Sequence, residues 1–328
     1  MPESKAETET QATVDKAVEV LRQGGLVALP TETVYGLAAD AKNPQAVAKV
    51  FAAKGRPSNH PLIIHLGSAD ALSQWADGIP DVAWQLARRF WPGPLTLLLR
   101  RKPEVPDSIV GGHPTVALRV PAHPLALAVL RAFGSGLVAP SANTFGRLSP
   151  TLAQHVREDL HNKVDWVVDG GPCTVGIEST ILDLSGKRPS IARPGGLTPE
   201  ALAEVLGFVP QRGLHAPAAP GLLRAHYAPS TQLILEKPEA LEAHAAKLCA
   251  QGKRVAVLCP KPLALPDNAQ WVCVPEDASQ LAHELYAALH ALDKQHFDVL
   301  LATLPKADGL GDALCDRLVR AANAFLKP

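Results

Sequence analysis

Apolar and polar residues along the first two hundred positions follow a pattern that predicts helices alternating with short strands. In residues 12–23 the apolar side chains recur at helical spacing, and Gly24 and Gly25 follow as a typical helix end. Residues 26–29 are apolar without interruption, as in a buried strand. Asn43 before Pro44 is typical of a helix start. Helices are expected over residues 12–23, 44–54, 80–90, 123–133, 150–158 and 198–206.

Several strand-like runs end in polar residues or are interrupted by them. His65 stands between Ile64 and Leu66, a position that burial alone would not give to an imidazole. The same design recurs in residues 115–121, 137–143, 178–183 and 190–196. Polar groups that converge at strand ends form small-molecule sites in α/β proteins. The chain is therefore predicted to be an enzyme, or a tight binder of an anionic small molecule.

The pattern changes near residue 210, and it divides the chain into domains at 1–210 and 231–328. Residues 211–230 hold three prolines and two glycines without periodicity, which predicts a linker. His226 and Tyr227 are unusual in an inert tether, so a functional role is left open. The last part is expected to be a smaller, Rossmann-like α/β domain. Its strands are expected near 231–235, 254–259, 271–274 and 298–302, and its helices near 238–250, 277–292 and 309–325.

Composition narrows the class of protein. Lys+Arg and Asp+Glu balance at 32 each, and basic residues occur only as short pairs, so stable nucleic-acid binding is not expected. No apolar run approaches the roughly 18 residues of a membrane span. The five cysteines show neither a Cys-x-x-Cys pair nor zinc-type spacing. We expect a cytoplasmic protein without a disulfide framework.

Common catalytic signatures are missing. The sequence contains no P-loop, no Gly-x-Ser-x-Gly and no His-Glu-x-x-His. Residues 134–139 match the loose dinucleotide pattern Gly-x-Gly-x-x-Ala. They follow a helix and precede a strand, however, whereas that fingerprint requires a strand and then a helix. Gly134 is therefore interpreted as a helix end.

The remaining signal is a set of four cations beside Pro or Gly in apolar surroundings: Lys54, Arg56, Arg119 and Arg193. Guanidinium groups held in this way suit phosphate or carboxylate. Alternatively, each arginine pairs with a nearby acid. Glu32 is the best lone carboxylate, for an ammonium group or for structure. Neutral donors are added by Thr31, Thr33, Ser141, Ser149, Ser179 and Thr180, of which Ser149 is also expected to cap the helix at 150. His65 alone would more often be a core histidine.

Six ordered motifs make residues 12–205 resemble the YrdC-type threonylcarbamoyl-AMP synthase family. They are Pro30-Thr-Glu-Thr-Val-Tyr-Gly36-Leu, Lys54-Gly-Arg-Pro-x4-Leu-Ile-Ile-His65, Trp91-Pro-Gly-Pro-Leu-Thr96, Leu118-Arg-Val-Pro121, Ala139-Pro-Ser-Ala-Asn143-x2-Gly146-x2-Ser149-Pro and Ile177-Glu-Ser-Thr-Ile181. The carboxy-terminal part resembles the extra domain of the longer members. The resemblance implies a twisted-sheet α/β catalytic domain that converts L-threonine, bicarbonate and ATP to threonylcarbamoyl-AMP and pyrophosphate. That product serves a downstream tRNA threonylcarbamoyl-transferase.

The resemblance also implies roles for individual residues. Positions matching the threonine site are Thr33, His65, Arg119, Ala139 and Ser179. Positions matching the ATP site are Lys54, Arg56, His60, Thr115, Ser141, Asn143, Ser149, Arg193 and Tyr227. Lys54 and Arg56 would offset charge developing on the phosphates, and Mg²⁺ would bind ATP rather than protein side chains. His60 stands where the family often has Asn, which puts that phosphate contact in doubt.

By the same resemblance, the linker is expected to act as a lid, with Tyr227 reaching the nucleotide. Two other functions remain open. Carbamoyltransferases contain a similar module, but with zinc-type cysteine pairs and an acylphosphatase-like module that are absent here. An RNA-binding module is the second alternative, and the neutral charge argues against it.

Overall fold

The computed structural model describes residues 5–213, 220–221 and 223–326, which fall into two compact units. Unit 1 comprises residues 1–145, 150–174 and 178–222, and unit 2 comprises residues 146–149, 175–177 and 223–328. Within the predicted linker, residues 214–219 and 222 lie outside the described residues. The α/β class and the presence of a second, smaller sheet agree with the prediction.

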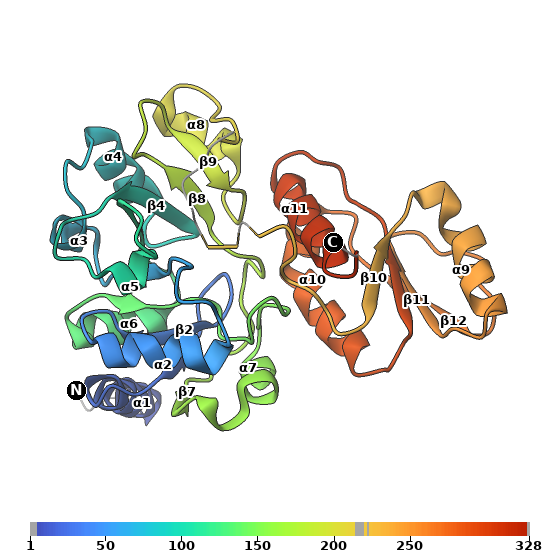
Figure 1. Ribbon diagram of the computed structural model, residues 1–328, viewed down its shortest axis with the longest axis horizontal. Coiled ribbons are helices and arrows are strands. Elements are labelled where there is room, and N and C mark those ends of the chain that lie inside the picture. The colour runs from blue at the N-terminus through green and yellow to red at the C-terminus, as the bar shows by residue number, and fades with distance from the viewer. Residues whose placement is uncertain (1–4, 214–219, 222, 327–328) are drawn as a thin grey trace. The chain divides into compact units, whose positions relative to one another are not determined.

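Unit 1 is built on a nine-stranded mixed sheet with the order β7-β1-β2-β6-β3-β5-β4-β8-β9 (Figure 1). The strands are β1 (Val27–Leu29), β2 (Gly36–Asp40), β3 (Ile63–His65), β4 (Leu95–Arg100), β5 (Thr115–Arg119), β6 (Leu137–Val138), β7 (Trp166–Val167), β8 (Thr180–Asp183) and β9 (Ser190–Arg193). The helices are α1 (Lys5–Arg22), α2 (Pro44–Lys54), α3 (Leu72–Trp75), α4 (Asp81–Phe90), α5 (Asp107–Val110), α6 (Pro124–Phe133), α7 (Ala153–Leu160) and α8 (Pro199–Leu206).

Local capping signals place most helix ends where the sequence predicts them. The Asn43 side chain accepts hydrogen bonds from the backbone N–H groups of Gln45 and Ala46 at the start of α2. Gly134 ends α6 with φ of 78°, a left-handed conformation that favours glycine. Two predicted helix starts are wrong: α1 begins at Lys5 rather than at residue 12, and α7 begins at Ala153 with Leu152 as its N-cap, so Ser149 does not cap it.

Helices cover the two faces of this sheet unequally. A large apolar cluster fills one face and includes residues from most strands. On the opposite face, α1 and α6 pack over β1, β2 and β6 in a second cluster that contains Leu137. Leu137 is the register partner of His65, so β3 continues this face. On β3, β5, β4 and β8, the face that α1 and α6 cover elsewhere carries a small apolar group and a series of polar side chains.

Unit 2 has a four-stranded, all-parallel sheet with the order β10-β13-β11-β12. Its strands are β10 (Gln232–Leu235), β11 (Val255–Cys259), β12 (Ala269–Cys273) and β13 (Val299–Ala302), and its helices are α9 (Leu241–Ala250), α10 (Ala278–Asp293) and α11 (Leu310–Asn323). All were predicted, although β12 begins two residues earlier than expected. Leu281, Leu285, Leu289 and Leu292 form the buried face of α10. Of the helices described in either unit, none combines the length and apolar character needed to span a bilayer.

Candidate functional site

Strand register collects the predicted site residues on the open half of one sheet face in unit 1. His65 and Arg119 are neighbours on the parallel strands β3 and β5. Thr96 pairs with Ile181, which in turn pairs with Arg193. Because side chains alternate along a strand, Thr115 shares the face of Arg119 at the other end of β5, about 13 Å away. His65, Arg119, Thr115 and Arg193, which are predicted for the threonine and ATP sites, therefore share one face of the sheet.

Arg119 is the most constrained of these side chains. Its guanidinium donates to Glu32 Oε1 at 2.6 Å, Thr33 Oγ1 at 2.9 Å and the Gly93 carbonyl at 3.1 Å. Glu32 also accepts from the backbone N–H of Ala122 at 2.9 Å. The alternative that an arginine pairs with a nearby acid thus holds for Arg119, and Glu32 has the structural role. A guanidinium has five N–H donors, so two remain for a ligand carboxylate.

His65 is buried beside this pair, with 5% of its surface exposed. Burial, reinforced by the Arg119 charge, holds the pKa of His65 well below the ordinary histidine value. The imidazole is consequently neutral at physiological pH. Ala139, predicted to contribute its backbone, is held by a hydrogen bond from its N–H to the Ile63 carbonyl at 3.0 Å.

Ser179 and Arg193 form a second group on the same face. Arg193 donates to the Ser179 carbonyl at 2.8 Å and to Ser179 Oγ at 3.2 Å. The Ser179 and Thr96 hydroxyls lie 2.8 Å apart. Arg193 also donates to the carbonyl of Pro220, 3.0 Å away in the predicted linker. A described linker residue therefore contacts an arginine predicted to bind ATP.

Lys54 holds the loop that follows β6. Its Nζ donates to the carbonyls of Ser141 and Asn143, each at 2.5 Å, and lies 3.4 Å from Asn143 Oδ1. Burial, followed by the nearby Arg56 charge, holds the pKa of Lys54 well below the ordinary lysine value. Because its donors point at backbone carbonyls, Lys54 orients Ser141 and Asn143.

Arg56 follows Gly55, the left-handed residue that ends α2. Its guanidinium donates to the Pro61 carbonyl at 2.8 Å and lies 5.4 Å from the centre of the Phe145 ring. The His60 ring meets the same phenyl ring edge-on, with centroids 5.3 Å apart. Partial burial and the Arg56 charge lower the pKa of His60, so a neutral imidazole stands beside the cation.

The predicted ATP site also includes Thr115, Ser149 and Tyr227. Thr115 is 5% exposed, and its hydroxyl forms no hydrogen bond within the described residues, so a ligand can use it. Ser149 and Tyr227 belong to unit 2. There, the Ser149 carbonyl lies 3.2 Å from His290 Nε2. Tyr227 is 2% exposed and lies 4.8 Å from the Arg317 guanidinium, measured to the centre of its ring.

The sequence did not indicate functional roles for Thr96 or Phe145, and it left the role of Glu32 undecided. Thr96 ends the motif that begins at Trp91. Its hydroxyl stands where a buried strand usually has an apolar side chain, and this could have indicated a role. Phe145 gave no such signal, because its contacts with Arg56 and His60 depend on the loop conformation. Among the described residues, no group of three or more His, Cys, Asp or Glu side chains is placed to hold a metal ion.

Comparisons with known proteins give a consistent result. Residues 19–195 match the family model described as "Telomere recombination", and residues 197–323 match "Threonylcarbamoyl-AMP synthase, C-terminal domain". The threonylcarbamoyl-AMP synthase of Pyrococcus abyssi is 41% identical, with 93% of each chain covered. The Bacillus subtilis enzyme of the same name is 40% identical, with 94% of this chain and 92% of its own covered.

Solved structures agree with these matches. The crystal structure of P. abyssi Sua5 complexed with L-threonine superposes with a TM-score of 0.88 at 40% identity, covering 95% of this chain and 94% of that one. A variant of the same protein, with a histidine and the adjacent tyrosine both replaced by alanine, superposes with a TM-score of 0.87 at 38% identity. That comparison covers 95% of this chain and 93% of the variant.

Proposed function

The chain belongs to the threonylcarbamoyl-AMP synthase family of the Sua5 type, and from this membership we propose how its residues carry out the reaction. The family's enzymes use ATP. We assign the substrates as L-threonine, bicarbonate and ATP, and the products as threonylcarbamoyl-AMP and pyrophosphate. The observation that carries the assignment of the amino-acid site is the guanidinium of Arg119, fixed by three acceptors with two donors left over.

L-Threonine is the amino acid in the solved P. abyssi complex, which supports the same substrate for this chain; we place it near Arg119 because of the free guanidinium donors there. Its carboxylate would take the two remaining N–H donors of Arg119. Ser179 Oγ and Thr33 Oγ1 would meet its hydroxyl and ammonium groups, with His65 and the Ala139 backbone completing the pocket. Because the pKa of His65 is low, the imidazole adds no positive charge that would repel the ammonium group.

The chemistry requires no protein nucleophile. The threonine ammonium group first loses a proton to solvent. The amine then adds to carbon dioxide with loss of a second proton, or to bicarbonate with loss of water, and gives a carbamate. One carbamate oxygen attacks the α-phosphate of ATP, and pyrophosphate leaves. Arg56 and Arg193 would stabilise charge on the phosphates, and His60, Thr115, Ser141 and Asn143 would bind the nucleotide. Lys54 would act by orienting Ser141 and Asn143. Mg²⁺ would arrive bound to ATP oxygens, because the described residues offer no carboxylate cluster for it.

We further propose residues 1–210 as the catalytic domain, 211–230 as a lid and 231–328 as an accessory domain. Two observations support a role for the lid: the Arg193–Pro220 hydrogen bond, and the existence of a solved P. abyssi variant lacking a His–Tyr pair. The sequence contains one such dipeptide, His226–Tyr227. The product is a reactive mixed anhydride, so a downstream tRNA threonylcarbamoyl-transferase would consume it.

The test is to incubate the protein with ATP, Mg²⁺, labelled bicarbonate and each amino acid, and to measure both pyrophosphate and labelled adenylate. We expect threonine to be preferred over valine by a factor on the order of 10⁴, since a site that binds the hydroxyl leaves its own polar groups unpaired with valine. Serine, which lacks only a methyl group, should be disfavoured by roughly 10- to 200-fold. Equal use of valine would contradict the roles of Ser179 and Thr33.

A further inference from the structure

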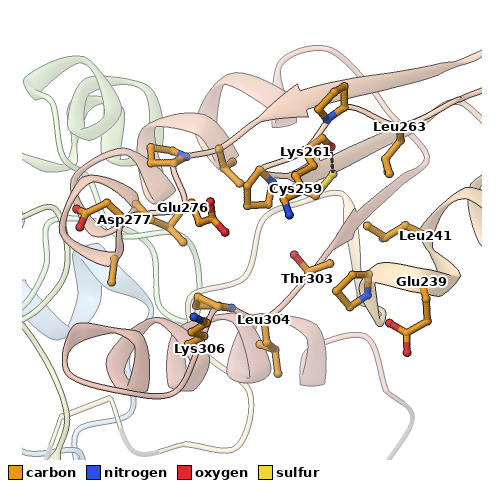
Figure 2. Close-up of a pocket in the computed structure, with 18 of the residues that line it drawn as sticks. Glu239, Leu241, Cys259, Lys261, Leu263, Glu276, Asp277, Thr303, Leu304 and Lys306 are labelled. Carbon is orange, nitrogen blue, oxygen red and sulfur yellow. Dashed lines mark hydrogen bonds between the residues drawn. The ribbon is translucent and has the colours of Figure 1, made fainter.

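Unit 2 contains a cavity of about 890 Å³ that the proposed reaction does not use. This volume lies within the range of about 300–1,000 Å³ found for small-molecule sites. Its lining comes from the segments after β11, β12 and β13 and from the start of α9, so it lies at the carboxyl edge of the parallel sheet (Figure 2).

The cavity also lies where the chain path reverses. From β11 the chain continues to β12 on one side, whereas from β13 it continues to α11, which contacts β10 on the other side. β11 and β13 are adjacent, and the residues that follow them, Cys259–Lys261 and Thr303–Lys306, line the cavity. In open α/β sheets, ligands bind in the crevice at such a topological switch point.

The lining combines apolar side chains with charged ones, most of which form no ion pair with another described residue. Leu241 and Leu263 contribute one wall, while Glu276 and Asp277 lie across the cavity from them, and Thr303 is between the two (Figure 2). Leu304 at the cavity is 43% exposed, an unusual position for a large apolar side chain. Among the described residues, Lys261, Lys306, Glu276 and Asp308 form no ion pair.

The features that would bind a phosphate are missing or already occupied. Pro260, Pro262, Pro275 and Pro305 have no backbone N–H to offer from the loops after the strands. At the start of α10, the Asp277 carboxylate already accepts from the N–H groups of Ser279 and Gln280, at 3.0 Å and 2.9 Å. Two lysines face four carboxylates around the cavity, which gives a net charge of −2. A polyphosphate would be repelled.

We propose that this cavity binds an uncharged nucleoside. The apolar wall of Leu241 and Leu263 would contact one face of the base, and the Thr303 hydroxyl can donate to or accept from its edge. The sugar hydroxyls would donate to carboxylates such as Glu276 and Asp308, which suit donors rather than phosphate oxygens. The proposal concerns unit 2 alone and is independent of the roles assigned in unit 1.

The experiment is equilibrium binding of adenosine, guanosine, cytidine and uridine, and of the matching mono- and triphosphates, to the full chain and three variants. Thr303→Phe places a bulky ring between the two sides of the cavity. Val319→Phe is the matched control, since Val319 lies on α11, is 39% exposed and does not line the cavity. Arg193→Ala impairs the proposed synthase site in unit 1.

We expect at least one nucleoside to bind the full chain with a dissociation constant below about 1 mM. In Arg193→Ala, where the synthase site is impaired, the matching monophosphate should bind at least about tenfold more weakly than that nucleoside. Thr303→Phe should lose nucleoside binding by at least about tenfold with unchanged pyrophosphate release, and Val319→Phe should bind like the wild type. Three results would each overturn the proposal. The first is that no nucleoside binds saturably, and the second is that nucleoside binding is lost in Arg193→Ala but not in Thr303→Phe. The third is that Arg193→Ala binds the triphosphate more tightly than the nucleoside.

If circular dichroism shows that Thr303→Phe is misfolded, Glu276→Lys provides a second test. This exposed substitution changes the net charge of the cavity from −2 to zero. The affinity ratio of monophosphate to nucleoside should then rise at least about tenfold, because a repulsive charge is replaced by an attractive one. An unchanged ratio would also contradict the proposal.

Discussion

Among single residues, Glu32 shows how a buried carboxylate acts through its neighbour. It touches Arg119 and the Ala122 N–H, and both charged side chains are less than 10% exposed. Removing one partner of a buried pair leaves the other charge uncompensated, which costs more than the pair itself contributes. Glu32 is therefore a positioning residue for the proposed threonine carboxylate site.

The first prediction concerns this pair. Glu32→Ala should lower the free energy of unfolding by about 3–5 kcal/mol. Glu32→Gln should retain more stability and raise KM for threonine more than it lowers kcat, because Arg119 loses its fixed orientation. Glu204→Gln is the matched control, since its ion pair with Arg89 is 58–59% exposed; surface pairs contribute only about 0–1 kcal/mol. Urea unfolding and steady-state kinetics measure both effects. A larger change in kcat than in KM would argue against the positioning role.

The second prediction is a pH dependence caused by His65. Its pKa is low in the folded state and near 6.5 when unfolded, so below that value the unfolded chain binds a proton that the folded one does not. Stability should therefore fall as pH drops from about 7 to 5, and His65→Asn should flatten this part of the curve. Urea unfolding across this range tests it, with exposed His161→Asn as control for the substitution itself. Parallel curves for wild type and His65→Asn would contradict the prediction.

How far sequence predicts the site also depends on single residues. The motifs located Lys54, Arg119, Ser179 and Arg193, because their residue types depart from the apolar pattern around them. The pairing of Arg119 with Glu32 could not be predicted, since the two lie 87 residues apart. Contacts at such separation are set by strand order and register. A single sequence, taken without an alignment, reveals neither.

At the scale of elements, local signals were sufficient for most helices. Asn43 correctly predicts the start of α2 and Gly134 the end of α6, because capping depends on residues within one turn of the helix end. The start of α7 failed for the opposite reason: Pro150 is held by a remote contact, accepting from the Tyr35 N–H at 2.8 Å. Two-residue strands such as β6 and β7 exist only through their partners. Four-residue helices such as α3 are too short to show periodicity.

The third prediction concerns the chain after β9. A Cβ on Gly195 would lie 2.3 Å from the Glu178 carbonyl oxygen and 2.4 Å from the Ser179 carbonyl carbon. Gly195→Ala must therefore move this segment away from Ser179, at a cost of about 1–3 kcal/mol, and lower activity by about tenfold. Gly186→Ala is the matched control, since nothing lies within 4 Å of its added methyl group. Thermal unfolding and pyrophosphate release give the readouts. Equal effects of the two substitutions would show that the close approach is unimportant.

At the scale of the whole molecule, Tyr227 links the predicted linker to the packing of unit 2. Tyr227 has φ of +62° and is packed with Arg317 and Tyr286 inside unit 2. A non-glycine residue in this region is strained, and such strain is frequent at functional positions. A large truncation would remove both the packing of Tyr227 in unit 2 and any contact that Tyr227 makes with the nucleotide. Point substitutions are therefore needed to distinguish the two roles.

The fourth prediction makes that separation. Tyr227→Ala and Tyr286→Ala should both destabilise unit 2 by about 3–5 kcal/mol, since each removes a buried ring. If Tyr227 reaches the nucleotide, Tyr227→Ala alone should raise KM for ATP, by about tenfold for one lost stacking contact of about 1–3 kcal/mol. The measurement is pyrophosphate release at temperatures where both variants remain folded. Identical kinetics of the two variants would mean that Tyr227 serves packing alone.

The outer strand β9 is covered by the chain that follows α8, and this has a consequence for solubility. The Ile191 N–H donates to the Gln211 carbonyl at 2.9 Å, and the Gly213 N–H donates to the Ile191 carbonyl at 3.1 Å. An uncovered outer strand presents free donors and acceptors to other molecules and invites intermolecular β-pairing. A fragment that ends at Pro210 would therefore expose the outer edge of β9. In a fragment that ends at Gly213, residues 211–213 would still cover this edge. We therefore expect the fragment ending at Pro210 to aggregate more readily than the one ending at Gly213.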